Sequence, residues 1–347
     1  MGLKCEAGRI INTNLVKYDV LSNLISTAYA KCNKDTILIY IDVYSIIKSL
    51  FNDSVVIDDY SILSSCIINM CAHYRQFFKN INVRTYFFIV YSDNCPQANS
   101  LICSEYNSGV SYMFKSNEKM YDAITKDLGL LQVLCPYLPD IAFIKRDMES
   151  SVCIYDIMCK YDIKNEFAHM VISKDDYVIP LVDMKPDTII LRPKKQNQQD
   201  LSYYIDASNA MTIFLQNKKV KQTDTFISPG LLSVIYTCNG LKCRSLKSLY
   251  NITNTLSILS KAISLGGIVN NHSSSLAALT FFSNKTPITI LQNRFAVIDI
   301  QHQHKLYMMS ALNTNYSNEI INMQDPDSVK HINDKYYKNN PLDLERL

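Results

Sequence analysis

Short apolar, β-branched runs alternate with helix-patterned segments over the first 190 residues, and this alternation constrains the fold more than any other feature. The runs are continuously apolar, which is typical of parallel strands that are buried on both faces. Strands separated by helices predict an α/β fold with three layers and a mostly parallel sheet. The predicted strands cover residues 36–41, 83–91, 141–144, 170–172 with 178–182, and 188–191.

Apolar residues at helical spacing predict the helices of the same region. An N-terminal helix is expected over residues 15–31, where Leu21, Leu24, Ile25 and Ala28 would share one face. The other helices are expected over residues 43–51, 61–79, 119–134 and 152–161.

Carboxylates accompany the ends of several predicted strands. Asp42 ends the first strand, Asp93 follows the second, and Asp175 and Asp176 interrupt the fourth, while Glu149 lies at the start of a helix. The carboxyl ends of parallel strands meet at one edge of the sheet, so these side chains would gather there. Neighbouring carboxylates repel each other unless a cation offsets them, and a divalent metal would account for the set. The alternative for each is structural: a helix cap, a favourable place beside a helix dipole, or a solvated turn.

The chain is nearly neutral, so any nucleic-acid binding must be local. Its 347 residues are 48% hydrophobic and carry a formal net charge of +3. Helices expected over residues 231–238 and 255–265 enclose a loop that carries Lys242, Arg244 and Lys247. Basic side chains on such a helical hairpin suit contacts with nucleic-acid phosphates. An ordinary hairpin with a solvated loop is the alternative.

The eleven cysteines include no C-x-x-C pair, and their number is odd. This pattern favours reduced, mostly buried thiols in a cytosol-like compartment over a disulfide or zinc framework. No run is long and apolar enough to span a membrane and no signal peptide is recognisable, so we expect a cytoplasmic protein. Frequent Asn, Ile, Lys and Tyr with no Trp fit an AT-rich genome, such as a viral one, which would place the protein in the host cytoplasm.

The C-terminal part carries fewer signals. Residues 278–282 and 295–300 are expected to form strands or other buried segments. His302 and His304 alternate with Gln and would share a face if they lay on a strand. Two histidines without a third ligand do not make a zinc site.

Three segments resemble the 5′-nuclease (flap endonuclease) branch of the PIN-like fold. The segment ILIYIDVYSII resembles the family's first strand, which ends at the family's first metal-site Asp. The segment DMESSVCIYDIM resembles the start of a family helix that carries a metal-site Glu. The segment ISKDDYVIPLV resembles a later part of the family sequence that carries a further metal-site Asp. The resemblance therefore implies catalytic, metal-binding roles for Asp42, Glu149 and Asp175 with Mg²⁺ or Mn²⁺, and Asp176 and Asp93 are added as candidates.

The same resemblance implies a substrate. The hairpin NGLKCRSLKSLYNITNT resembles the helix–three-turn–helix element that grips duplex DNA in this family. The implied activity is 5′-nuclease action on branched or nicked DNA, or on RNA–DNA ends, with replication proteins as conceivable partners. The expected layout is a lead over residues 1–35, a nuclease domain over 36–230, the hairpin over 231–270 and an extension over 271–347.

The chain departs from the family pattern at several positions. Where the family has a second acid after its Glu, this chain has Ser151, and a second Asp of the later motif falls on Tyr177. Glycines of the family hairpin fall on Ser248, Asn251 and Thr253. Fewer carboxylates weaken the binding of a divalent ion. The alternative function is therefore a catalytically degenerate, nuclease-like protein that binds nucleic acid or serves as a subunit of an assembly.

Overall fold

The fold is seen in a computed structural model. It describes residues 16–20, 33–43, 62–92, 118–146, 149–162, 164–173, 178, 180–185, 187–192, 201–205, 231–239, 249–250, 254–255, 257–259, 261, 272–283 and 286–313.

A seven-stranded sheet forms the centre of the described part, in the order β1-β7-β6-β5-β2-β3-β4. The five strands from β2 to β6 pair in parallel, whereas β7 pairs antiparallel with β6 and β1 antiparallel with β7. This confirms the predicted mostly parallel α/β sheet. The strands are β1 Val16–Val20, β2 Thr36–Asp42, β3 Arg84–Ser92, β4 Ile141–Arg146, β5 Ala168–Ile172, β6 Thr188–Arg192 and β7 Leu201–Ile205.

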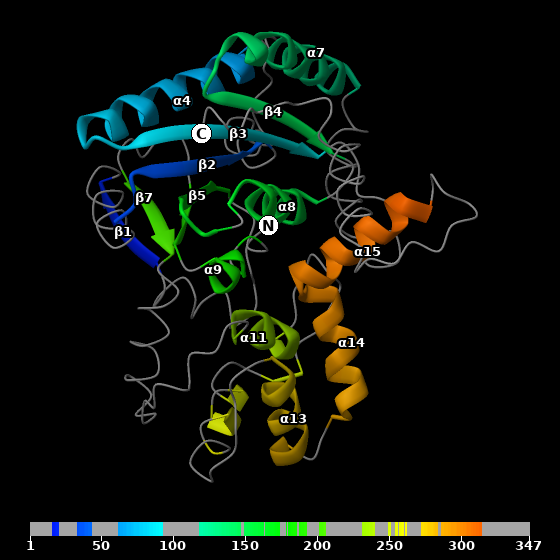
Figure 1. Cartoon of the computed structure of the whole chain (residues 1–347). Coiled ribbons are helices and arrows are strands. Elements are labelled where there is room, and N and C mark those ends of the chain that lie inside the picture. The colour runs from blue at the N-terminus through cyan, green and yellow to red at the C-terminus, as the bar shows by residue number, and fades with distance from the viewer. Residues whose placement is uncertain are drawn as a thin grey trace.

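The strand β2 separates two apolar cores, and all seven of its residues are buried. Ile37, Ile39 and Ile41 face the helices α4 (Ile62–Asn80) and α7 (Glu118–Leu134). Leu38 and Tyr40 face the opposite core, which contains helix α8 (Ser150–Tyr161). Figure 1 shows the resulting layers, with α4 and α7 on one side of the sheet and α8 on the other. Burial on both faces explains why β2 is continuously apolar.

The core beside α8 continues into further helices away from the sheet (Figure 1). We call α11, α13 and α14 the helical arm; α15 follows the arm and returns to pack against α8. The bounds are α11 Leu231–Asn239, α13 His272–Ser283, α14 Ile288–Ile298 and α15 Ile300–Asn313.

Two expectations for the sheet region were wrong. Part of the predicted helix over residues 15–31 is strand β1, because Val16, Tyr18 and Val20 alternate with polar residues and pair with β7. The strand β7 itself was not predicted. The second half of the predicted fourth strand is replaced by the short helix α9, Leu181–Met184, which begins after Pro180.

The strands considered for residues 278–282 and 295–300 are also wrong, because both segments are helical apart from Asp299. Leu291, Phe295 and Ile298 are buried at helical spacing, a pattern that a short window does not reveal. His302 and His304 lie on α15 rather than on a strand, so they point about 200° apart around the helix axis.

Candidate functional site

Asp42 is the last residue of β2, and its side chain is held by a neighbouring strand. The register aligns Ile41 with Ile172, so Asp42 and Ser173 follow side by side at the carboxyl ends of β2 and β5. Ser173 Oγ donates a hydrogen bond of 2.8 Å to Asp42 Oδ2. Asp42 is 2% exposed and Ser173 is 0% exposed. The contact therefore orients a buried carboxylate from the adjacent strand.

The same position is the topological switch point of the sheet. The chain leaves β2 through α4 toward β3, whereas it leaves β5 through α9 toward β6 on the other side of β2. These connections also cover opposite faces, because α4 packs in one core and Leu181 of α9 in the other. Open α/β sheets bind ligands in the crevice that such a divergence leaves at the carboxyl ends of the strands. Asp42 and Ser173 are at this point.

Glu149 immediately precedes α8 and is its N-cap residue. It follows the end of β4 by three residues and has φ −58° and ψ 140°, the extended conformation of a capping residue. Its carboxylate makes no capping hydrogen bond, yet the residue is only 2% exposed. Because α8 runs from the carboxyl edge of the sheet back to its amino edge, Glu149 lies at the same edge as Asp42.

Asp42 and Glu149 also share a face of the sheet. Side chains alternate along a strand, so Asp42 points to the same side as Leu38 and Tyr40, which is the side that α8 covers. The structure thus brings two buried carboxylates, from β2 and from the start of α8, to one edge and one face. Parity along β5 places Ser173 on this face as well.

The other candidate residues lie outside the described residues. They are Asp93, Asp175, Asp176, Lys242, Arg244 and Lys247. Within the described ranges, no group of three or more His, Cys, Asp or Glu side chains is arranged to hold a metal ion. The metal site and the basic hairpin consequently stay predictions.

The chemistry of the donors at this edge fits a hard divalent cation. Mg²⁺ and Mn²⁺ prefer oxygen ligands, and a buried carboxylate is costly unless a cation or hydrogen-bond donors offset its charge. At the first turn of α8, the hydroxyls of Ser150 and Ser151 are buried and have no hydrogen-bond partner within the described part of the chain. These oxygens add polar capacity beside Glu149.

Ser173 is a site residue that sequence reasoning did not single out. Its signal is its place as the first residue after a buried strand, two residues before the acidic pair at 175 and 176. The contact of Ser173 with Asp42 could not be predicted from the sequence, because β5 pairs with β2 although two strands lie between them in the chain.

A second buried polar cluster lies toward the amino edge. Tyr40 Oη bonds to His169 Nδ1 at 3.0 Å, and His169 Nε2 bonds to Asp162 Oδ2 at 2.9 Å. Asp162 Oδ1 also accepts the backbone N–H of Glu166, and Lys185 Nζ donates to the Asp162 carbonyl at 2.8 Å. The Tyr40–His169 and His169–Asp162 contacts join β2 and β5 to Asp162, the residue that follows α8.

The network fixes the protonation states of its members. Burial lowers the pKa of His169 below its usual value and outweighs the opposing effect of Asp162. Burial acts to raise the pKa of Asp162, but its hydrogen bonds with His169 and the Glu166 N–H and the charge of Lys185 bring it below the usual value. Burial likewise raises the pKa of Tyr40. His169 is therefore neutral, with Nε2 as donor and Nδ1 as acceptor, and the cluster serves to hold elements together.

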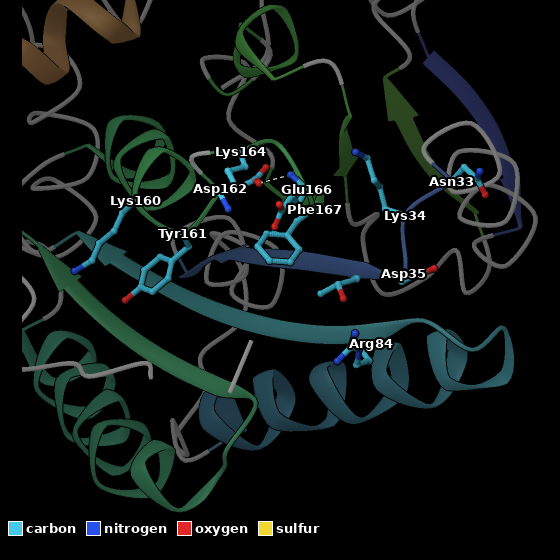
Figure 2. Close-up of a pocket in the computed structure, with 11 residues that line it drawn as sticks. Asn33, Lys34, Asp35, Arg84, Lys160, Tyr161, Asp162, Lys164, Glu166 and Phe167 are labelled. Atoms are coloured by element: carbon cyan, nitrogen blue, oxygen red, sulfur yellow. Dashed lines mark hydrogen bonds between the residues drawn. The ribbon is translucent and has the colours of Figure 1, made fainter. Parts of the chain in front are cut away.

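A cavity of about 670 Å³ opens beside this network, at the amino edge of the sheet. Figure 2 shows Lys160 at one end of it and Asn33 and Lys34 toward the other, with Asp162, Lys164 and Glu166 between them. Charges of both signs that do not converge make no anion site. The carboxyl edge with Asp42 is consequently the better candidate for function.

Comparisons with known proteins find similarity only among solved structures. No family model and no curated protein sequence matches the chain. The bacteriophage T5 D15 flap endonuclease, in a complex with DNA and metal ions, has 10% identity and a TM-score of 0.48, covering 87% of this chain and 98% of its own. Human GEN1 with Holliday junction DNA has 10% identity and a TM-score of 0.44, covering 94% of this chain and 72% of its own.

The catalytic core of Rad2 in complex with DNA substrate has 11% identity and a TM-score of 0.43, covering 99% of both chains. Among these structures, the T5 D15 protein is named a flap endonuclease, which is the family that three segments of this sequence resemble. Because the TM-scores are below 0.5, the fold assignment rests on the order and register of the sheet. No helix in the described ranges is both long and apolar enough to cross a membrane.

Proposed function

We propose that the chain is a divalent-metal-dependent, structure-selective 5′-nuclease that acts on DNA with a flap, nick or RNA–DNA end. The observation that carries the proposal is the pair of buried carboxylates, Asp42 and Glu149, on one edge and one face of the sheet beside its switch point. The resemblance of three sequence segments to the flap endonuclease family supports the same function. Hydrolysis of a phosphodiester is the chemistry that carboxylate-held Mg²⁺ or Mn²⁺ assists.

In this proposal Asp42 and Glu149 hold the metal, and Asp175, Asp176 and Asp93 supply further carboxylates. The bound ion would lower the pKa of a water nucleophile and offset the developing charge on the phosphate. Ser173 keeps the Asp42 carboxylate in one orientation through its hydrogen bond to Oδ2. The N-terminal dipole of α8 favours the negative charge of Glu149.

A specific observation favours a second candidate, a nucleic-acid-binding protein without catalysis. Ser151 stands where the resemblance places a second acid, and its hydroxyl is fully buried with no hydrogen-bond partner in the described ranges. A hydroxyl brings no charge to a metal site, and the number of charged ligands largely sets the affinity for a divalent ion. The first candidate cleaves DNA and the second does not, whereas both bind it.

The test is cleavage of defined DNAs by the purified full chain. We expect a 5′-flapped or nicked duplex to be cut in Mg²⁺ or Mn²⁺, single-stranded DNA to be cut more slowly, and chelation by EDTA to stop the reaction. Adding back either metal should restore it. Tight binding of the flapped duplex without cleavage in either metal would reject the nuclease and favour the second candidate.

The basic hairpin gives a prediction under either candidate. Replacing Lys242, Arg244 and Lys247 by Ala should weaken binding to a nicked duplex of any sequence, because with each lost phosphate contact fewer counterions are released from the DNA on binding. The log–log dependence of affinity on salt should become flatter by roughly 0.9 per contact. Fluorescence anisotropy at several salt concentrations measures both effects. Unchanged affinity with an unchanged slope would contradict a phosphate-binding hairpin.

A matched control for that variant lies at the amino edge of the sheet. Lys79, Arg84 and Lys164 are exposed there, on the side opposite to Asp42. Replacing all three by Ala removes three positive charges without altering the hairpin. This triple variant should keep the parental affinity and salt slope, so a loss confined to the hairpin variant reports local contacts rather than net charge.

A further inference from the structure

The helix α15 is tied to the helical arm by a single residue. Asp299 separates α14 from α15: its N–H donates to Phe295 O at 2.7 Å, and its carbonyl accepts from Gln303 N at 3.0 Å. Its carboxylate also accepts the N–H of His302 at 3.2 Å. Gln303 Nε2 then donates across the junction to Ala296 O at 2.6 Å. This bonding makes the junction an elbow with a fixed angle.

The arm behind that elbow is one packed unit. Arg294 Nε of α14 donates to Thr237 O of α11 at 2.9 Å. Tyr250 Oη bonds to Thr286 Oγ1 at 2.6 Å, just before α14. Apolar residues of α11, α13 and α14 share one core. A change in the position of the arm therefore moves the start of α15.

The other end of the linkage is α8. His304 Nε2 of α15 bonds to Asp156 Oδ1 of α8 at 2.7 Å, and these side chains are 20% and 12% exposed. The His304 ring also meets the Tyr155 ring edge-on, with centroids 5.6 Å apart. Figure 1 shows α15 passing beside α8 on the side away from the sheet. The helix α8 is thus enclosed between the sheet and α15.

The contact between α15 and α8 lies further along the same helix whose N-cap residue is Glu149. Asp156 follows Glu149, the N-cap residue of α8, by seven residues, which is about two helical turns. Their separation along the axis is roughly 10 Å. A helix is stiff over this length, so a shift of α8 at Asp156 carries Glu149 with it.

We propose that α15 couples the helical arm to Glu149, with His304 and Asp156 as positioning residues. A duplex nucleic acid whose phosphates bind the arm would thereby favour one placement of the amino end of α8. By linkage, whatever occupies the edge with Glu149 and Asp42 changes the affinity for that duplex by the same factor. The identity of the arm's ligand rests on the proposed function; the mechanical linkage from arm to α8 does not.

The linkage is tested by hydrogen exchange at the first turns of α8, residues 150–154, in the full chain with and without a nicked duplex. We expect the duplex to slow exchange there by about tenfold, the change that corresponds to roughly 1.4 kcal/mol of local opening free energy. In His304→Ala the free protein should exchange faster and the duplex should lose this effect. His304→Gln, which keeps a donor for Asp156, should restore it in part.

Gln76→Ala is the matched control, because it removes one side-chain hydrogen bond, to Asn80 on α4, outside the linkage, and leaves the α15–α8 contact intact. It should behave like the parent at residues 150–154. The inference is overturned if a duplex that is shown by fluorescence anisotropy to bind leaves exchange at these residues unchanged in the parent, or if His304→Ala exchanges and responds as the parent does. Neither result depends on cleavage, so a catalytically inactive parent would reject the nuclease proposal and leave this test intact.

Discussion

Replacing Asp42 by Asn is expected to lower the rate of metal-dependent cleavage of a flapped duplex by about a thousandfold or more, while the duplex is still bound. The change removes a formal charge from a buried side chain and preserves its size. Loss of metal stabilisation worth about 4 kcal/mol in the transition state corresponds to a factor of about a thousand. Single-turnover cleavage in Mg²⁺ and Mn²⁺ measures the rate, and anisotropy in Ca²⁺ measures binding.

The same strand supplies the control. Asp35 precedes β2 at the amino edge and is exposed, so Asp35→Asn removes an equal charge far from the site. It should cleave at the parental rate. Ser173→Ala, which removes only the donor to Asp42 Oδ2, should fall between the two. Parental cleavage by Asp42→Asn would exclude Asp42 from the metal site.

The parts of the site that the sequence predicted are those encoded by local pattern. Asp42 was found because a strand buried on both faces is continuously apolar, so that a charge at its end is conspicuous. Glu149 was predicted because it lies at the start of a helix, three residues after another such strand. In both cases the residue's position along its own element decides its place in the fold.

The parts that were missed depend on contacts between distant segments. The edge strand β1 gains its conformation from β7, which follows it by about 180 residues, and neither segment has the apolar run of a central strand. Ser173 meets Asp42 only because β5 inserts beside β2. The helices α13 and α14 were misread because windows of five or six residues are too short to show a helical period.

The polar network behind the site depends on the same pairing of β2 with β5, and it predicts a large effect on stability. Asp162→Ala should lower the free energy of unfolding by about 1–3 kcal/mol at pH 7.5, the usual cost of leaving a buried hydrogen-bond donor without its acceptor. The change leaves His169 Nε2–H without its acceptor in a buried environment and also removes the acceptor of the N–H of Glu166, an exposed residue. Urea unfolding followed by circular dichroism measures the difference.

The network also gives the parent protein a defined loss of stability in acid. The pKa of His169 is lower in the folded protein than its ordinary value of 6.5, so the unfolded chain takes up a proton first as the pH falls. The contribution of His169 is therefore complete above pH 6.5 and declines below it. The pKa of Asp162 is lowered from 3.8, so its own contribution persists to lower pH before it is lost.

Two controls separate this network from general surface effects. Asp187→Ala removes an ion pair in which Lys34 Nζ lies 3.7 Å from Asp187 Oδ2 and the Asp187 side chain is 38% exposed. A pair of this kind contributes about 0–1 kcal/mol. His73→Gln removes an exposed histidine and should keep the parental decline below pH 6.5, whereas His169→Gln should lessen that decline. If Asp162→Ala unfolded at the same urea concentration as Asp187→Ala, the network would not be what holds β2, β5 and α8 together. The orientation of Asp42 relative to Ser173 would then have to depend on the strand pairing alone.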